Sequence, residues 1–287
     1  MMTPFSLNIK GRLMTYERPA IMAVVNFTPD SFYAASRTLG DDNRLADTVR
    51  RAVDEGADMI DCGAYSSRPG ADDVSADEET RRLSHGLEII RRVAPDAIVS
   101  VDTFRASVAR RAVCDFGADI INDISGGTLD ESMFDTVAEL SVPYVLMHMR
   151  GTPATMQSLT DYDGNVTAAV IADLAAKADR LAQAGVCDII IDPGFGFSKT
   201  LEQNYRLLAD LEAFKLLGRP LLVGVSRKSM ATRLLGISAD EALNATTVIN
   251  TLAVERGASI LRVHDVKACR EAVSIIYDGL LPQTGQS

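Results

Sequence analysis

Acid and amide side chains stand where several short apolar runs of this chain end. Asp192 follows the β-branched run 189–191, and a Pro-Gly pair then prevents further strand pairing. Asp102 and Asn122 end two other apolar runs in the same way. One such group could simply cap a following helix, but three at strand ends are better explained by a shared polar ligand. We therefore expect these three side chains to face one cavity.

Cationic side chains gather near the ends of the last two apolar runs. Arg227 and Lys228 precede an expected helix, whose free N-terminal amides and dipole favour an anion. Arg262 and His264 alternate along the final run and so share one face. The chain as a whole carries a net charge of −10, so cations that converge in it indicate a bound anion. This pattern predicts a phosphate site.

Two long loops follow the first two apolar runs. The first spans residues 27–42 after Asn26, and a loop of more than about 12 residues in a compact domain is usually functional. We expect a residue among 41–43 to cap the helix that follows it. The second loop, 62–70, holds Ser67 and Arg68, and its composition suits an anion-binding lid or a plain solvent loop.

Two further groups are interpreted more simply. His148 ends the fifth run, but no second histidine lies at a metal-binding spacing, so we interpret it as a packed residue behind the site. For Phe195 and Phe197, stacking on a flat ring and packing in the core both remain open.

The elements that must position these residues repeat along the chain. Four segments, near residues 55, 116, 184 and 256, share a glycine, a small residue, an apolar run and a polar end. The glycine suits the left-handed cap of a helix, and the run is typical of a strand buried on both faces. Four more apolar runs bring the expected strands to eight. The pattern predicts an α/β fold, a (β/α)8 TIM barrel with its active site at the carboxyl ends of the strands.

A doubly wound open sheet is the alternative, although the repeat spacing and the lack of a nucleotide fingerprint count against it. The barrel is expected over residues 19–281 as one domain. Alternating apolar residues and a turn at 10–12 predict an N-terminal β-hairpin in residues 1–18, which would plug the amino-terminal end. Residues 282–287 are expected to form a C-terminal tail.

Composition narrows the class of protein. A hydrophobic fraction of 47% supports a large core, while the negative net charge and a pI near 4.8 argue against binding nucleic acid or anionic membranes. The four cysteines show no CxxC spacing and are expected to be buried thiols. Since no signal peptide or membrane span is recognisable, we expect a cytoplasmic protein.

Seven short motifs together resemble the dihydropteroate synthases, a family of pterin-binding TIM barrels. They occur in the order and at the spacing of that family, and they cover about residues 21–277. The motifs are NFTPDSF at 26–32, SSRPG at 66–70, SVDT at 100–103, INDI at 121–124, DPGFGF at 192–197, SRKS at 226–229 and RVHD at 262–265.

The resemblance implies an enzyme of folate biosynthesis, a transferase that moves a pterinylmethyl group to an arylamine. It would condense 6-hydroxymethyl-7,8-dihydropterin pyrophosphate with para-aminobenzoate, giving 7,8-dihydropteroate and pyrophosphate by an SN1-like step. Sulfonamides should compete as arylamine mimics. A homodimer is also implied, through outer helices in 239–257 and 266–280.

The resemblance also implies a role for each site residue. The catalytic residues would be Lys228, Arg262 and His264. The pterin would be bound by Asp102, Asn122, Asp192 and Lys228, between the apolar walls Met147 and Ile124. The pyrophosphate would be bound by Ser67, Arg262, His264 and Asn26, with Asn26 also holding Mg²⁺. The aminobenzoate pocket would be formed by Arg68, Pro69, Phe197 and Ser229.

The sequence departs from the family pattern in its loops. Tyr65 stands where many members have glutamate, Ser67 replaces threonine, and residues 33–36 replace an acidic, glycine-rich run. Two alternatives stay open. A methyltetrahydrofolate-binding methyltransferase shares the barrel but needs no pyrophosphate site. A non-catalytic pterin-binding paralogue should have lost some of the leaving-group residues.

Overall fold

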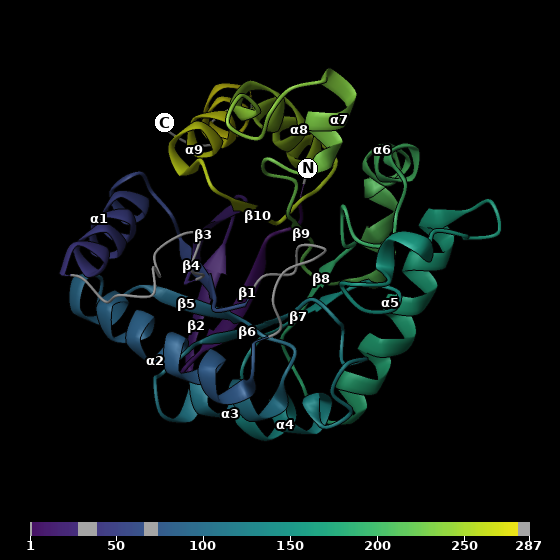
Figure 1. The fold of residues 1–287 in the computed structure, drawn as a ribbon. Coiled ribbons are helices and arrows are strands. Elements are labelled where there is room, and N and C mark those ends of the chain that lie inside the picture. Colours follow the sequence, from purple (N-terminus) through teal and green to yellow (C-terminus); the bar gives the residue numbers. More distant parts are fainter. Residues whose placement is uncertain (1, 28–38, 66–73, 281–287) are drawn as a thin grey trace, which may run out of the picture.

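Parallel strands form a closed ring in the computed structural model, which describes residues 2–27, 39–65 and 74–280 (Figure 1). The barrel strands are β3 (Ala20–Asn26), β4 (Met59–Gly63), β5 (Ile98–Asp102), β6 (Ile120–Asp123), β7 (Tyr144–Met147), β8 (Ile189–Asp192), β9 (Leu222–Val223) and β10 (Ile260–Val263). Their order in the 8-stranded sheet is β8-β7-β6-β5-β4-β3-β10-β9. A parallel bridge from Ile191 to Leu221 joins the two ends. The predicted TIM barrel is confirmed, and the open doubly wound sheet is wrong.

Strand β9 is shorter than the apolar run 221–226 suggests. Only Leu222 and Val223 belong to it, and they pair with Ile260 and Leu261 of β10. The run is interrupted by Gly224, and a glycine weakens a strand because it adds no side chain to the packing. The join between β8 and β9 is therefore narrow.

Helices surround the sheet, as Figure 1 shows. The α-helices are α1 (Leu39–Asp54), α2 (Ala76–Val93), α3 (Ala106–Cys114), α4 (Met133–Leu140), α5 (Val166–Gln183), α6 (Leu201–Ala209), α7 (Ser229–Leu235), α8 (Leu243–Glu255) and α9 (Val266–Ser274). Two 3₁₀ segments, η1 (Met156–Ser158) and η2 (Leu211–Leu217), and a π-helical end, η3 (Ile275–Leu280), complete the described elements.

The start of α1 differs from the prediction. Residues 41–43 are the third to fifth residues of the helix and do not cap it, because α1 begins at Leu39. Acidic residues are favoured in a first turn by the helix dipole as well as at the cap position, so their type alone does not separate the two.

The repeated glycines end helices as predicted. Gly56, Gly117, Gly185 and Gly257 have φ angles of +95°, +67°, +97° and +99°. This left-handed conformation is nearly free of strain only for glycine. Each glycine therefore turns the chain from a helix into the next buried strand.

The N-terminal hairpin closes the amino-terminal end of the barrel. Strands β1 (Phe5–Ile9) and β2 (Arg12–Tyr16) pair antiparallel around a turn in which Lys10 and Gly11 both have positive φ, as a two-residue hairpin requires. Apolar side chains of β1 form one buried cluster with residues near the starts of the barrel strands, among them Ala20, Ile120 and Ile260. The predicted plug is confirmed.

The main hydrophobic core lies between the ring of strands and the helices. All four cysteines are free; Cys62 and Cys269 are buried, but Cys114 and Cys187 are exposed, so the expectation of four buried thiols is wrong. Cys114 is the last residue of α3 and Cys187 lies just before β8, at the ends of elements where side chains meet solvent. Within the described ranges, no helix is long and apolar enough to cross a membrane.

Candidate active site

The strand register brings the predicted pterin residues to one end of the barrel. Asp102 at the end of β5 pairs with Asn122 of β6, and Met147 at the end of β7 pairs with Asp192 of β8. Gly63 of β4 pairs with Asp102 on its other side. Because parallel strands all end at the same edge, these side chains come from adjacent positions around the mouth of the barrel.

Arg262 of β10 reaches across the mouth to two carboxylates. Its Nε donates to Asp61 Oδ2 at 2.7 Å, and its Nη2 donates to Asp102 Oδ2 at 3.2 Å. Asp61, in β4, also accepts from Ser100 Oγ at 2.6 Å and from Asn122 Nδ2 at 3.2 and 3.3 Å. Asp61 is fully buried and was not predicted as a site residue. It fixes both Arg262 and Asn122.

The Asp102 carboxylate is poised between its two protonation states. Burial raises its pKa to about 7, against the opposing effect of Arg262, while Asp61 pushes the pKa further upward. The hydroxyl of Tyr65 donates to Asp102 Oδ1 at 2.9 Å. The carboxylate is thus held by a donor on each oxygen.

Asp192 and Lys228 face each other across the join between β8 and β9. Asp192 is buried, and its Oδ1 accepts the backbone N–H of Gly194 at 2.7 Å. Burial raises its pKa, and the Lys228 cation opposes that shift. Lys228 Nζ donates to the Phe195 carbonyl at 2.8 Å, and burial lowers its pKa to about 8 although Asp192 favours the charged form.

An apolar cluster lies beside these polar groups. Its buried members are Ile124, Met147, Met149 and Met156, and packed against them are Tyr65, Leu129 and Phe197. The two predicted walls, Ile124 and Met147, are therefore in one cluster. Met149 and Met156 were not predicted, although the alternation of Met147 and Met149 around His148 was a usable signal.

A hollow lies between α1 and the carboxyl ends of β3 and β10. Asn26 and His264 line it, together with Arg44 and Arg51 of α1. The two arginines were not predicted, but a seven-residue spacing puts them on one face of a helix. Asp47 also lines the hollow, and burial lowers the pKa of His264 to about 4, so this ring is neutral and not the cation that the sequence suggested. The two arginines therefore supply the positive charge of the hollow.

His264 is held in one orientation by Ser226. The Ser226 Oγ accepts the backbone N–H of His264 at 3.2 Å and lies 3.0 Å from its Nδ1. Since that oxygen already accepts one hydrogen, its own proton is available for Nδ1. This arrangement favours the tautomer with the proton on Nε2, from which it can donate to a ligand.

The chain is similar to known proteins. The family model described as "Pterin binding enzyme" matches residues 22–264. The dihydropteroate synthase of Escherichia coli K12 is 39% identical over 272 residues, which cover 93% of this chain and 94% of that relative. The chain belongs to the dihydropteroate synthase family.

Solved structures of the family have the same fold. A Xanthomonas albilineans dihydropteroate synthase with 4-aminobenzoic acid has a TM-score of 0.86 and 36% identity, over 98% of this chain and 100% of that one. A second structure from that organism, in complex with 7,8-dihydropteroate, has a TM-score of 0.83 and 34% identity, over 97% and 100% of the two chains. The predicted family and enzyme class, a transferase of the dihydropteroate synthase type, are confirmed.

Some predicted residues lie apart from the site or outside the described ranges. Arg227 turns away from the mouth and donates to both oxygens of Asp265, at 2.8 and 2.9 Å, so it is not one of the converging cations. Ser67, Arg68 and Pro69 fall in 66–73, outside the described residues.

The two aromatic residues after β8 differ from each other. Phe195 is fully buried in the core, whereas Phe197 is half-buried beneath the Lys228 ammonium, which lies 4.8 Å from the ring centroid. Ser229 is the first residue of α7 and follows Lys228 directly. Phe197, Lys228 and Ser229 therefore lie close together at the mouth of the barrel.

A buried lysine behind the site was missed. Lys199 Nζ donates to the carbonyls of Gly194 and Phe197, at 3.0 and 2.9 Å, and lies 3.0 Å from His148 Nδ1. Burial lowers its pKa to about 7, against the favourable charge of Asp192. His148 is itself buried, which confirms that it packs behind the site. Lysine is usually a surface residue, so the sequence carried no signal for this role.

The donor set near Asn26 is compatible with the predicted Mg²⁺. Asn26 is half-buried, and its amide makes no side-chain hydrogen bond to a described residue, so its oxygen remains available. No group of three acid, histidine or cysteine side chains that could hold a metal occurs in the described part of the chain. Mg²⁺ commonly keeps several waters and takes further oxygens from substrate phosphates, so one protein oxygen beside a phosphate site fits.

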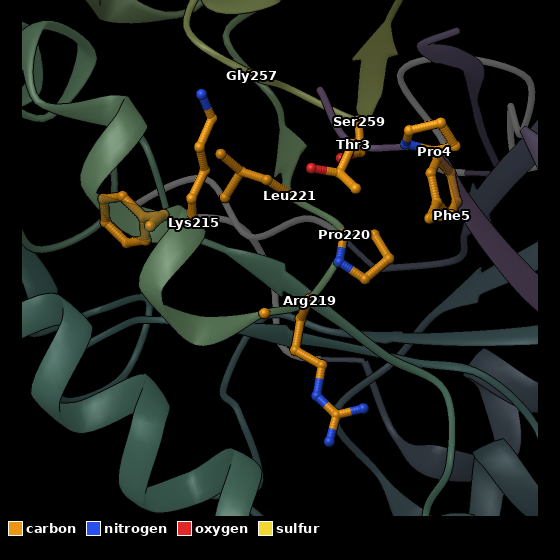
Figure 2. Close-up of a pocket in the computed structure, with 11 residues that line it drawn as sticks. Thr3, Pro4, Phe5, Lys215, Arg219, Pro220, Leu221, Gly257 and Ser259 are labelled. Atoms are coloured by element: carbon orange, nitrogen blue, oxygen red, sulfur yellow. The ribbon is translucent and has the colours of Figure 1, made fainter. Parts of the chain in front are cut away.

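A separate cavity of about 170 Å³ lies at the opposite end of the barrel (Figure 2). Thr3, Pro220 and Ser259 line it, close to the starts of β1, β9 and β10. Since family active sites are at the carboxyl ends of the strands, this cavity is not part of the candidate active site.

Proposed function

We propose that the chain condenses 6-hydroxymethyl-7,8-dihydropterin pyrophosphate with para-aminobenzoate, giving 7,8-dihydropteroate and pyrophosphate. One observation carries this proposal. Hydrogen-bonding groups for a flat heterocycle, an apolar wall and a separate cationic hollow meet at one end of the barrel. Methyl transfer from a folate would use the first two features but would leave the hollow without a role.

Pterin binding would rest on Asp192, Asp102 and Asn122. The second oxygen of Asp192 and the remaining lone pairs of Oδ1 can accept parallel N–H bonds from the 2-amino and N3 positions of the pterin. Asp102 and Asn122 would bind the rest of its edge, and Lys228 would donate to its carbonyl. Ile124 and Met147 would contact its faces, because their cluster borders these polar groups.

The pyrophosphate would occupy the hollow at Asn26 and His264. Arg262 and the Nε2–H of His264 would donate to its oxygens, with Ser67 as a further donor, and Arg44 and Arg51 would add positive charge. Asn26 would hold Mg²⁺, which when bound supplies positive charge to the phosphate oxygens. The groups so placed stabilise negative charge where the leaving group forms.

The arylamine would enter beside Phe197 and Ser229, with Arg68 and Pro69 completing its pocket. The bond between the pterin methylene and the bridging oxygen breaks first, and its electron pair leaves with the pyrophosphate. The dihydropterin delocalises the resulting positive charge. The neutral amine uses its free lone pair to form the C–N bond, so it needs no base to attack. The ammonium nitrogen so formed then loses its proton to water or to the departing pyrophosphate. Stabilising the leaving group therefore supplies the main catalysis, as in an SN1-like step.

A homodimer is part of this proposal. Large apolar side chains are exposed on the last described helices: Leu234 and Leu235 of α7, Leu243 and Val248 of α8, and Ile275 and Leu280 of η3. Exposed apolar residues that gather on neighbouring elements favour contact with another protein surface. They support the expected interface in 239–257 and 266–280 and extend it to α7.

Turnover with both substrates tests the function. We expect purified protein with Mg²⁺ to produce dihydropteroate and pyrophosphate in equal amounts. Pterin binding without turnover would support the binding paralogue. Methyl transfer from methyltetrahydrofolate would support the methyltransferase.

An isotope experiment tests the order of bond breaking. The pterin pyrophosphate is labelled with ¹⁸O at the bridging oxygen and incubated with enzyme and Mg²⁺, without arylamine. Movement of the label to non-bridging positions, or slow pyrophosphate release, is the expected result. If neither occurs until para-aminobenzoate is added, a concerted displacement is the better mechanism.

A further inference from the structure

Tyr65 lies two residues beyond the end of β4 and reaches the carboxyl end of β5. Its hydroxyl donates to Asp102 Oδ1 at 2.9 Å, while Arg262 Nη2 donates to Oδ2 at 3.2 Å. A carboxylate has about four lone-pair directions, so two remain for a ligand. Tyr65 and Arg262 therefore fix the plane of the Asp102 carboxylate and leave acceptor positions on both oxygens free for a ligand.

The position of the hydroxyl is set by packing of the ring. Tyr65 meets Phe104 edge to face, with 5.2 Å between centroids and an angle of 86°. It also packs against the cluster that contains Ile124 and Met147. From the other side, Gly63 holds Asp102 closely, since a Cβ at Gly63 would lie 3.2 Å from Asp102 Cβ. Tyr65 thus joins the apolar wall to the polar edge of the site.

The charges around Asp102 make this hydrogen bond consequential. Arg262 of β10 and Lys228 beyond β9 favour the ionised carboxylate, whereas Asp61 of β4 and Glu79 of α2 oppose it. Cys62 of β4 is also near, but burial raises its pKa and keeps it a neutral thiol. Burial and the Asp102 charge raise the pKa of Tyr65 as well, so its hydroxyl stays protonated and donates at working pH. A glutamate at this position would add negative charge instead.

We propose that Tyr65 is a positioning residue for the dihydropterin. Its hydroxyl orients the Asp102 carboxylate and favours the ionised form that accepts an N–H from the pterin, and its ring extends the wall on which the pterin lies. This role rests on the proposed function and acts through Asp102. It belongs to this chain's own version of the loop, where tyrosine replaces the more usual glutamate.

The test is Tyr65→Phe, which keeps the ring and removes only the hydroxyl. We expect KM for the pterin pyrophosphate to rise about tenfold, as for the loss of one hydrogen bond to a charged group, with KM for para-aminobenzoate unchanged. Without the donor, the pKa of Asp102 rises. The acidic limb of kcat/KM for the pterin should then move to higher pH by about one unit.

Tyr144→Phe is the matched control. Tyr144 donates to Asp123 Oδ2 at 2.7 Å. Asp123 also accepts from the amide and hydroxyl of Ser125 and from the Gly127 amide, so the Tyr144–Asp123 pair stabilises the turn after β6. We expect it to lower stability without moving the acidic limb. An unchanged pterin KM and pH profile in Tyr65→Phe would overturn the proposal. If the wild-type protein showed no turnover, the proposed function would fail, and calorimetric binding of the pterin pyrophosphate from pH 5.5 to 8 would still test Tyr65 by the same comparison.

Discussion

The buried carboxylates of the site differ in how completely the protein itself satisfies them. Asp61 accepts from Arg262, Ser100 and Asn122, so its oxygens are engaged within the chain. Within the part of the chain that the structure describes, the Asp192 carboxylate accepts a hydrogen bond only from the Gly194 amide, and burial raises its pKa. A buried carboxylate with spare acceptor capacity is suited to a ligand, whereas one that is fully engaged is suited to holding other side chains.

Asp192→Asn tests this difference. The amide oxygen can keep the Gly194 hydrogen bond, but the new NH₂ group faces a ligand N–H and leaves it unpaired. We expect pterin affinity to fall by about 1–3 kcal/mol, measured by calorimetry. The protein should still fold, because the shape is kept, although Lys228 and Lys199 lose a carboxylate that favours their charged forms. Unchanged affinity would remove Asp192 from the pterin site.

At the scale of elements, the loop between β8 and α6 is tied down from beneath. Lys199 joins two of its carbonyls to His148, and Gly194 packs directly on the β7 end. Gly194 has a φ of +71°, and a Cβ there would lie 2.0 Å from the His148 carbonyl oxygen. Asp192, Phe195 and Phe197 depend on this packing for their positions.

Gly194→Ala should therefore displace the loop. We expect a loss of stability larger than the roughly 1–2 kcal/mol typical of a left-handed alanine, together with weaker pterin binding. Gly185→Ala is the control, since Gly185 has a φ of +97° but open space around its Cβ position. Urea unfolding of both variants separates backbone strain from the clash. Equal losses in the two would contradict the packing argument.

Lys199 should make stability depend on pH. Its pKa in the folded protein is about 7, below the ordinary 10.5, so between these values the unfolded chain binds the extra proton. Stability therefore rises with pH above 7, by up to about 1.4 kcal/mol per pH unit from this residue, and the full cost is present below pH 7. Lys228 contributes with the same sign.

Urea unfolding at pH 7 and pH 8.5 checks this prediction. Lys199→Met should lose roughly 1–2 kcal/mol of the pH-dependent gain that the wild-type protein shows. The buried thiols of Cys62 and Cys269 begin to ionise in the unfolded chain near pH 8.5, and this contribution is the same in the wild type and the variant, so it cancels in the comparison. A variant with the same pH dependence as the wild type would show that Lys199 is not the group that titrates.

The sequence predicted the regular elements better than the tertiary contacts. The hairpin turn and the glycines that end helices were predicted correctly, because each depends on a few neighbouring residues. The strand ends placed Asp102, Asn122 and Asp192 at one mouth because parallel register follows from the βα repeat. Asp61 and Lys199 were missed because their roles depend on side chains distant in sequence, Arg262 in one case and His148 in the other.

At the scale of the whole molecule, exposed apolar side chains on α7, α8 and η3 make the dimer testable. Light scattering at micromolar concentration should give twice the chain mass of 30.9 kDa. Val248→Asp should shift the mass toward that of one chain, because a charge would enter an apolar contact. Leu216→Asp, at an exposed leucine of η2, is the control and should leave the mass unchanged. A wild-type mass of about 31 kDa would refute the dimer.

The narrow join between β8 and β9 is the place where the barrel should open most easily. Only Leu222 and Val223 pair with β10, and a single bridge at Leu221 meets β8, so the fewest strand bonds hold this side. Asp192 follows one side of this join, at the end of β8, and Lys228 follows the other, beyond β9. A pterin that contacts both residues would stabilise the closed barrel at this join. Amide hydrogen exchange at Leu222 and Val223 should therefore slow when the pterin binds. Exchange at Val99 and Val101, in the well-paired β5, should change little. Transient opening of the barrel between β8 and β9 and binding of the pterin would then exclude each other.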